Sequence, residues 1–277
     1  MRVVYDERMT APAQGFSPSA AKPAAVIQAW REAWPGLQIR VPLPVDVETL
    51  SLAHARSYVE DVFAMREPNG FGTCSADVNA SLPYTTGAML TAARWALADG
   101  GSVAAPVSGF HHAGWDSGGG FCTFNGLMVT ALALQRDHPG LKVGILDYDY
   151  HYGNGTDDIL EHLRPRDIAH VTAGRKWTQP AHATGFLAHI EDDIARLHDP
   201  GIVLYQAGAD PHIDDPLGGF LTTSQLAMRD WKVFDGLHRR GVPVAWNLAG
   251  GYQTPLSRVI ALHVNSFRAA QAVHYPE

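Results

Sequence analysis

Two aspartates and a histidine alternate with tyrosines where an apolar run ends, and their side chains could hold a metal ion. They are Asp147, Asp149 and His151, within residues 145–155. On an extended chain a spacing of two places all three on one face. Two carboxylates and an imidazole at one point are costly without a cation, and both residue types are ordinary zinc ligands. A strand end with hydrogen-bonded polar side chains is the alternative.

A third aspartate, Asp210, also follows directly after an apolar run, at residues 202–205. It could supply the third ligand of an open catalytic site. An N-cap or turn aspartate explains the same residue equally well. The Asp214-Asp215-Pro216 sequence that follows is predicted to shape a loop.

Two further segments carry groups suited to acid–base chemistry. His111 and His112 are adjacent after an apolar run and could be ligands, acid–base groups or a surface pair. Three glycines at 118–120 could let the backbone approach a ligand or form a flexible turn, and they lack the spacing of a phosphate loop. Tyr252 follows two glycines at a predicted strand end, where its hydroxyl can point inward. A core or surface tyrosine is the alternative.

These motifs sit on a repeating pattern of short apolar runs, polar or glycine-rich stops, and helices. The predicted strands are 3–5, 102–107, 143–146, 168–171, 202–205 and 242–246. The predicted helices are 24–34, 50–65, 85–97, 125–136, 156–163, 185–196, 224–239 and 255–272, with loops at 10–23 and 66–83. The rhythm is typical of a parallel sheet covered on both faces. Chemistry is then expected at the carboxyl edge of the sheet, where each motif lies.

The overall composition narrows the choice of partners and compartment. With 277 residues, 46% of them hydrophobic, the chain is expected to form one α/β domain over residues 1–277. A net charge of −7 without a Lys/Arg run argues against nucleic-acid and anionic-membrane partners. The two cysteines, Cys74 and Cys122, cannot build a disulfide framework. Together with an N-terminus unlike a signal peptide and no run long enough to span a bilayer, this predicts a cytoplasmic protein.

Taken together and in this order, the motifs resemble the histone deacetylase family, which includes acetylpolyamine amidohydrolases and related bacterial deacetylases. The matching segments are Gly109 with His111-His112-Ala113, Gly120-Phe121-Cys122, Asp147 to Gly155, Gly208-Ala209-Asp210, Gly250-Gly251-Tyr252 and the early helix around residues 52–59. The resemblance implies a three-layer arginase/deacetylase fold, with a mainly parallel central sheet flanked by helices.

The resemblance also implies a single Zn²⁺ held by Asp149, His151 and Asp210. Since this ligand set has one imidazole and two carboxylates, Fe²⁺ and Co²⁺ are alternatives. Family members bind a structural monovalent cation as well. Here K⁺ or Na⁺ would be held by the side chain of Asp147 and by the chain around Asp149, His151 and Thr172.

Catalytic roles follow from the same resemblance. His112 would be the general base and acid, hydrogen-bonded to Asn154, and His111, oriented by Asp147, would be its electrostatic partner. Tyr252 would donate to the developing oxyanion.

The substrate tunnel would be lined by Phe121, with Gly120 and Gly251 allowing a close approach.

The implied function is zinc-dependent hydrolysis of an N-acyl amide to a carboxylate and a free amine. Acetyl-lysine, an acetylpolyamine and a small N-acyl metabolite all remain open as substrates, as does a homo-oligomeric state. Two alternatives stay open: a non-catalytic member that binds acylated ligands, and a two-manganese ureohydrolase of the arginase type.

Overall fold

The central sheet is parallel throughout, as predicted. The computed structural model describes residues 1–275, and within them seven strands form one sheet in the order β2-β1-β3-β7-β6-β4-β5. The strands are β1 (Arg2–Val4), β2 (Gln38–Arg40), β3 (Ser102–Ala105), β4 (Val143–Asp147), β5 (Ile168–Thr172), β6 (Ile202–Gln206) and β7 (Val244–Asn247). Strands β3, β4, β6 and β7 are buried along their whole length, because helices cover both faces.

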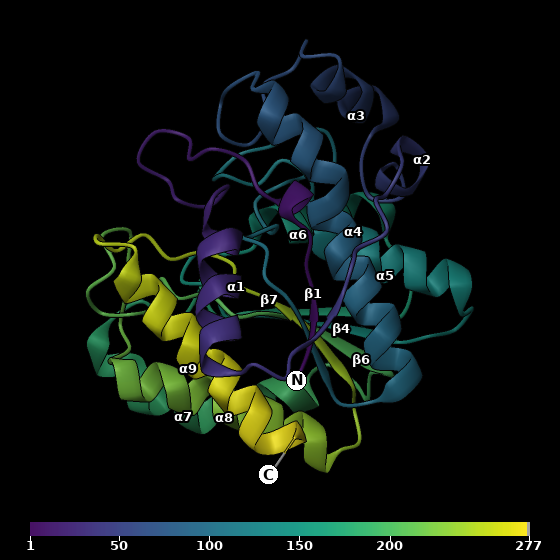
Figure 1. The fold of residues 1–277 in the computed structure, drawn as a ribbon. Coiled ribbons are helices and arrows are strands. Elements are labelled where there is room, and N and C mark those ends of the chain that lie inside the picture. The colour runs from purple at the N-terminus through teal and green to yellow at the C-terminus, as the bar shows by residue number, and fades with distance from the viewer. Residues whose placement is uncertain (276–277) are drawn as a thin grey trace.

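The helices form the two outer layers of an α/β sandwich (Figure 1). One layer packs in the order α1 (Lys22–Ala33), α9 (Ser257–His274), α8 (Thr223–Arg239) and α7 (Ala183–Ala195). The other contains α4 (Ala76–Asp99) and α5 (Gly126–Asp137), with α6 (Asn154–Leu163) beside α5. Trp30 joins the first layer to the sheet, with ring centroids 5.5 Å from Trp246 and 4.4 Å from Phe267. None of the helices within residues 1–275 has both the length and the apolar character needed to cross a membrane.

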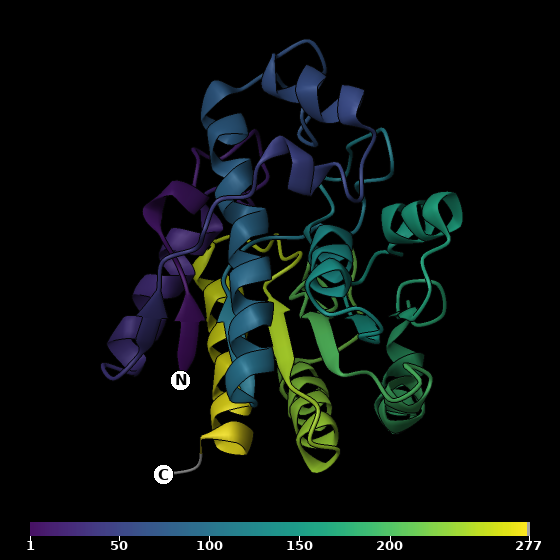
Figure 2. The same ribbon diagram turned by 90° about the vertical axis from the view of Figure 1, so that its right-hand side faces the viewer.

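The strands run from the end of the molecule that holds the N-terminus toward the end that carries α2 (Val47–Leu50) and α3 (Arg56–Phe63) (Figure 2). Strands β4, β6 and β7 end at one level. Asp147 is level with Gln206, and Gln206 is level with Asn247. The segments that follow these strands therefore leave the sheet side by side, and they carry the predicted site residues.

The predicted helix over 50–65 is wrong, because the chain there forms two short helices, α2 and α3. Residues 51–55 turn between them, and the Ala55 N–H donates to the carbonyl oxygen of Trp115 at 2.8 Å. His54 lies in this turn and is fully buried. Its ring Nδ1 is 2.8 Å from the Gly114 oxygen, and its Nε2 accepts the Asn125 N–H at 2.8 Å. Tertiary hydrogen bonds thus interrupt a helical apolar pattern.

The predicted loop over 66–83 is also too long, since α4 begins at Ala76. The Ser75 hydroxyl caps this helix by accepting the Val78 N–H at 3.4 Å. Pro83 lies inside the helix, where a proline normally argues against helical structure. Strand β2 was not predicted, and its alternating pattern leaves Gln38 and Arg40 exposed at the sheet edge.

The buried imidazole of His54 predicts an acid-sensitive fold. Burial lowers its pKa to about 4, while an unfolded histidine has a pKa of about 6.5. As pH falls between these values, the unfolded chain binds a proton that the folded chain does not. The free energy of unfolding should then fall by up to about 3 kcal/mol from this residue.

Urea unfolding from about pH 7 to about pH 4 tests this prediction. The substitution His54→Gln keeps an amide donor and acceptor but cannot titrate, so its acid-side loss of stability should be smaller than that of the wild type. His138→Gln, at an exposed position, is the control and should follow the wild type. If the free energy of unfolding fell with pH by the same amount in His54→Gln and in the wild type, His54 would not be the source of the acid sensitivity.

Candidate active site

The three predicted metal ligands meet at the carboxyl edge of the sheet. One ligand atom from each of Asp149, His151 and Asp210 lies within 4.8 Å of the others. The Nδ1 of His151 is 3.2 Å from Asp149 Oδ1 and 3.0 Å from Asp210 Oδ2. The expected single strand face is not observed, because β4 ends at Asp147. The chain then turns, so Asp149 and His151 face Asp210 while Asp147 faces His111.

The charges of this cluster fit a bound cation. Burial, together with the neighbouring Asp149 carboxylate, raises the pKa of Asp210 to about 8. Burial opposes ionisation of Asp149 too, but His111 and His151 hold its pKa well below the ordinary value. Burial lowers the pKa of His151, yet its bonds to both carboxylates raise it to about 11. Two carboxylates buried this close together need compensating positive charge. A divalent metal ion would supply that charge.

Glycine is required where the backbone passes this cluster. The Gly250 N–H donates to Asp149 Oδ2 at 2.8 Å, and a Cβ at Gly250 would lie 2.4 Å from Asp210 Oδ2. Gly251 adopts a φ of 139° and the preceding Ala249 a φ of 52°. Positive φ in an alanine is uncommon and concentrates at functional sites. Gly250 therefore lets the backbone pass close to the two carboxylates, and Gly251 supplies the positive φ that follows it.

In each of the two adjacent histidines, the ring Nδ1 lies within hydrogen-bond distance of a side-chain oxygen. His111 Nδ1 is 2.7 Å from Asp147 Oδ2, and its Nε2 is 3.6 Å from Asp149 Oδ1. His112 Nδ1 is 2.5 Å from Asn154 Oδ1. The two ring centroids are 4.1 Å apart. The predicted pairings of His111 with Asp147 and of His112 with Asn154 are thus present in the structure.

The two histidines differ electrostatically. Burial lowers the pKa of His112, and the neighbouring His111 lowers it further. Burial also acts against charge on His111, but Asp147 and Asp149 outweigh it and raise its pKa to about 9. With an amide oxygen as its Nδ1 partner, neutral His112 carries its proton on Nδ1. Its Nε2 is then free to accept a proton.

Tyr252 lies beside the cluster with its hydroxyl protonated. Burial raises its pKa, and the Asp210 and Asp149 carboxylates raise it further, while a hydrogen bond with Ser19 opposes the shift. The Tyr252 N–H donates to Asp215 Oδ2 at 2.8 Å. Asp215 does shape its loop as predicted, since its Oδ1 accepts the Leu217 N–H, but it also anchors the tyrosine. That second role was not predicted.

A group of aromatic rings extends outward from the tyrosine through Phe121. The Phe121 ring centroid lies 5.6 Å from that of Tyr252, 5.7 Å from Phe71 and 5.6 Å from Phe16, which is 71% exposed. Phe121 itself has a φ of 65°. A Cβ at the preceding Gly120, whose φ is 53°, would lie only 2.4 Å from the His112 ring. The predicted tunnel residues therefore lie against the catalytic candidates, and Phe16 and Phe71 extend the apolar surface outward.

The residues predicted for a monovalent cation lie next to one another. Thr172 ends β5 level with Asp147, and its hydroxyl accepts the Gly153 N–H at 3.3 Å. His170, which was not predicted, lies behind Asp147 with its Nε2 at 3.8 Å from Oδ2 and its Nδ1 at 2.7 Å from Asp157. His170 falls inside a predicted strand, and its spacing from other polar residues does not mark it as a site residue. The cation site itself stays a prediction.

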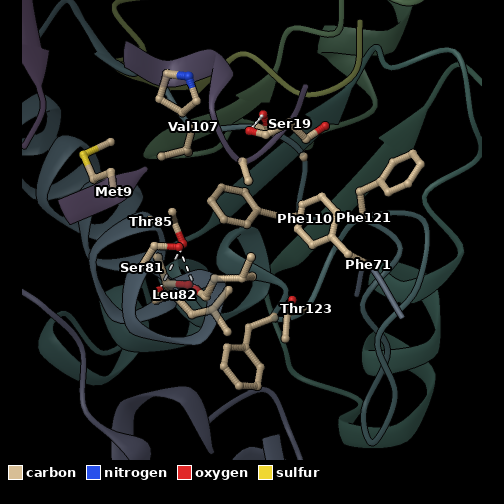
Figure 3. Close-up of a pocket in the computed structure, with 17 residues that line it drawn as sticks. Met9, Ser19, Phe71, Ser81, Leu82, Thr85, Val107, Phe110, Phe121 and Thr123 are labelled. Carbon is tan, nitrogen blue, oxygen red and sulfur yellow. Dashed lines mark hydrogen bonds between the residues drawn. The ribbon is translucent and has the colours of Figure 1, made fainter. Parts of the chain in front are cut away.

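A small apolar cavity lies beside the site rather than in it (Figure 3). The rings of Phe71, Phe110 and Phe121 line it, with Met9 and Leu82 among the other lining residues. Its volume is about 50 Å³, and among the described residues its lining includes none of the three metal ligands. A space this small holds little more than ordered water. The described lining of the cavity therefore adds no carboxylate or imidazole to the candidate site.

Lys22 is another buried group near the site that was not predicted. Its side chain is fully buried, and its Nζ donates to the Ala249 oxygen at 2.6 Å. Burial lowers its pKa to about 8. The lysine lies in a segment predicted as loop, without any motif to mark it.

Known proteins resemble this chain in sequence and in fold. The family model for the histone deacetylase domain matches residues 18–171. A probable deacetylase of Methanothermobacter thermautotrophicus is 25% identical over 242 residues, covering 74% of this chain and 71% of that protein. An acetylpolyamine amidohydrolase of Mycoplana ramosa is 37% identical over 173 residues, covering 52% and 50%. The crystal structure of the HDA15 HD domain superimposes with a TM-score of 0.80 at 20% identity, over 99% of this chain and 93% of that one.

Proposed function

This chain belongs to the histone deacetylase family, and from that membership we propose that it hydrolyses an N-acyl amide to a carboxylate and a free amine. One observation carries the proposal. The ligand atoms of Asp149, His151 and Asp210 converge within 4.8 Å, beside a pair of histidines that each have their own acceptor. We propose Zn²⁺ as the native metal, with Fe²⁺ or Co²⁺ as alternatives, and K⁺ or Na⁺ at the structural site.

The metal would be held by Asp149, His151 and Asp210. A divalent ion bound there supplies a Lewis acid that polarises the acyl carbonyl and lowers the pKa of a water molecule. Its charge would also neutralise the two buried carboxylates. The remaining chemistry falls to side chains of this chain.

His112 would move the proton. Its free Nε2 would accept a proton from the attacking water and later deliver one to the leaving amine. Asn154 keeps the ring in the required tautomer by accepting from Nδ1. His111, held by Asp147, would stabilise negative charge beside it.

Tyr252 would donate a hydrogen bond from its hydroxyl to the negative charge that develops on the carbonyl oxygen of the acyl group. The raised pKa of Tyr252 supports this role, because the group stays protonated at neutral pH. Asp215 fixes the backbone that carries it. Phe121 would guide the acyl chain, with Gly120 and Gly251 allowing a close approach.

For the substrate we propose an acylated primary amine: acetyl-lysine, an acetylpolyamine or a small N-acyl metabolite. Relatives named as deacetylase and as acetylpolyamine amidohydrolases support this range, and a net charge of −7 suits a cationic amine product. We also propose one catalytic domain over residues 1–277, of which 276–277 lie outside the described residues. The free thiols of Cys74 and Cys122 agree with a cytoplasmic location.

Hydrolysis of a substrate panel tests the proposal directly. The panel contains an acetyl-lysine peptide, N-acetylputrescine and a trifluoroacetyl-lysine reporter, each with and without a chelator. Turnover that the chelator abolishes and added zinc restores is the expected result. Tight binding without turnover would favour a non-catalytic acyl-ligand protein, and two manganese ions per chain would favour a ureohydrolase.

A further inference from the structure

A buried ion pair lies beneath the metal-ligand cluster, on α8. The side chains of Arg229 and Asp230 are both fully buried. The Arg229 Nε and Nη2 each lie 2.8 Å from Asp230 Oδ1. The other Asp230 oxygen accepts the Ser266 hydroxyl of α9, and Asp230 also accepts the Tyr205 hydroxyl of β6. The arginine is therefore fixed by groups from three elements.

The third guanidinium nitrogen, Nη1, links the chain after β4 to the chain after β6, beyond the point where the backbone pairing of these strands ends. The ladder between β4 and β6 ends at Asp147 and Gln206, with one further bond from the Tyr148 N–H to the Gln206 oxygen at 3.0 Å. Beyond it the Arg229 Nη1 donates to the Tyr148 oxygen at 2.9 Å and to the Gly208 oxygen at 2.7 Å. One nitrogen thus spans both strand ends.

Those two carbonyls directly precede the metal ligands. Tyr148 is one residue before Asp149, and Gly208 is two residues before Asp210. No sheet hydrogen bond fixes the separation of the strands at this level within the described residues. Beyond the ladder the two segments are joined by the arginine and by the Tyr150 N–H, which donates to Asp210 Oδ1 at 3.2 Å. The arginine is the contact that bridges the two backbones themselves.

Stability alone does not explain such a pair. A buried salt bridge costs several kcal/mol of desolvation per ion, and apolar replacements of similar volume are often neutral or stabilising. The rigid, planar guanidinium offers something that an apolar side chain lacks, which is several donors at fixed directions. Here they join Asp230 to the two strand ends.

We propose that Arg229 is a positioning residue that holds Asp149 and Asp210 at the spacing required for metal binding. The inference rests on the proposed function, because it requires that these carboxylates bind a metal. Loss of the arginine leaves every ligand in place but lets the two strand ends separate. Metal affinity and ligand geometry should then change together.

The test compares Arg229→Met and Arg229→Lys with the wild type. Zn²⁺ affinity is measured by competition with a chromophoric chelator, and ligand geometry by the visible absorption of bound Co²⁺. Arg229→Met should bind Zn²⁺ about 10–100-fold more weakly, as removal of groups that orient metal ligands typically does. Its Co²⁺ bands should shift. Arg229→Lys keeps the positive charge but lacks the several fixed donors of the guanidinium. Its Zn²⁺ affinity should lie between those of the wild type and Arg229→Met.

Two further variants make the result specific. Arg239→Met removes an exposed arginine of the same helix, paired with Asp235 and Glu191, and should leave affinity and spectrum unchanged. If Arg229→Met does not fold, Ser266→Ala is used instead. It removes only the hydroxyl that anchors Asp230 and should still weaken Zn²⁺ binding several-fold.

The outcomes separate this inference from the proposed function. Wild-type affinity and Co²⁺ bands in folded Arg229→Met, or in Ser266→Ala if that variant replaces it, would overturn the positioning role. Metal binding that survives Asp210→Ala would instead overturn the metal site itself. A loss of thermal stability in Arg229→Met that is equal with and without metal, with unchanged affinity, would assign the pair a structural role only and also reject the inference.

Discussion

Tyr252→Phe should lower kcat by about 10²–10³-fold, the usual cost of losing one donor to an oxyanion. The raised pKa of Tyr252 keeps its hydroxyl protonated near neutral pH, so this donor is available before any charge develops. The donor matters most when the oxyanion forms, so the loss should appear in kcat with little change in KM. Steady-state kinetics on the best panel substrate measures both.

The metal should remain bound in this variant, because the tyrosine is not among the clustered ligand atoms. Metal analysis after gel filtration checks that point. Tyr150→Phe is a matched control, since Tyr150 is half-buried next to the cluster but donates its hydroxyl to the Thr178 oxygen. It should keep near wild-type turnover. If Tyr252→Phe does so as well, the oxyanion role is lost.

Asp210→Ala should lower metal affinity by more than about 100-fold, beyond the effect typical of groups that only orient ligands. Asp210 provides one of three converging ligand atoms, and its removal leaves a single carboxylate with one imidazole. Metal content after dialysis against a weak chelator, and competition with a chromophoric chelator, measure the loss.

Asp214→Ala tests whether the loss is specific to the ligand position. Asp214 is exposed in the neighbouring loop, so this variant removes a nearby negative charge without touching the cluster. It should retain wild-type metal content and turnover. Stoichiometric metal in Asp210→Ala after the same dialysis would rule out the ligand assignment.

The sheet could be predicted from local pattern, whereas the full ligand set came from the family resemblance, because the pattern alone left Asp210 open as a turn or N-cap aspartate. Apolar runs between glycine-rich stops mark buried parallel strands, and each of β4, β6 and β7 was predicted within a few residues. Parallel strands end at one edge, so residues following them had to converge. Asp149, His151 and Asp210 are brought together for that reason.

The supporting residues could not be predicted, because their roles arise from contacts between distant segments. Lys22 lies 227 positions before the Ala249 oxygen that it binds. Arg229 reaches Tyr148, which lies 81 positions away in the chain. His54 interrupts a helical pattern through bonds to Gly114 and Asn125. None of these three residues stands in a spacing that distinguishes it from an ordinary polar side chain.

The strand order has a consequence for how the chain folds during synthesis. Strands β4, β5 and β6 pair among themselves, whereas β3 pairs with the early strand β1 and with β7, so that Ser102 is level with Val244 far along the chain. Non-local parallel pairing is slow, and segments made first fold first. We therefore expect β4 and β6 to bring Asp149, His151 and Asp210 together before β7 adds the segment that carries Tyr252. Binding of the proposed metal would then precede completion of the proposed active site, and an ion bound early would favour the correct pairing of β4 with β6.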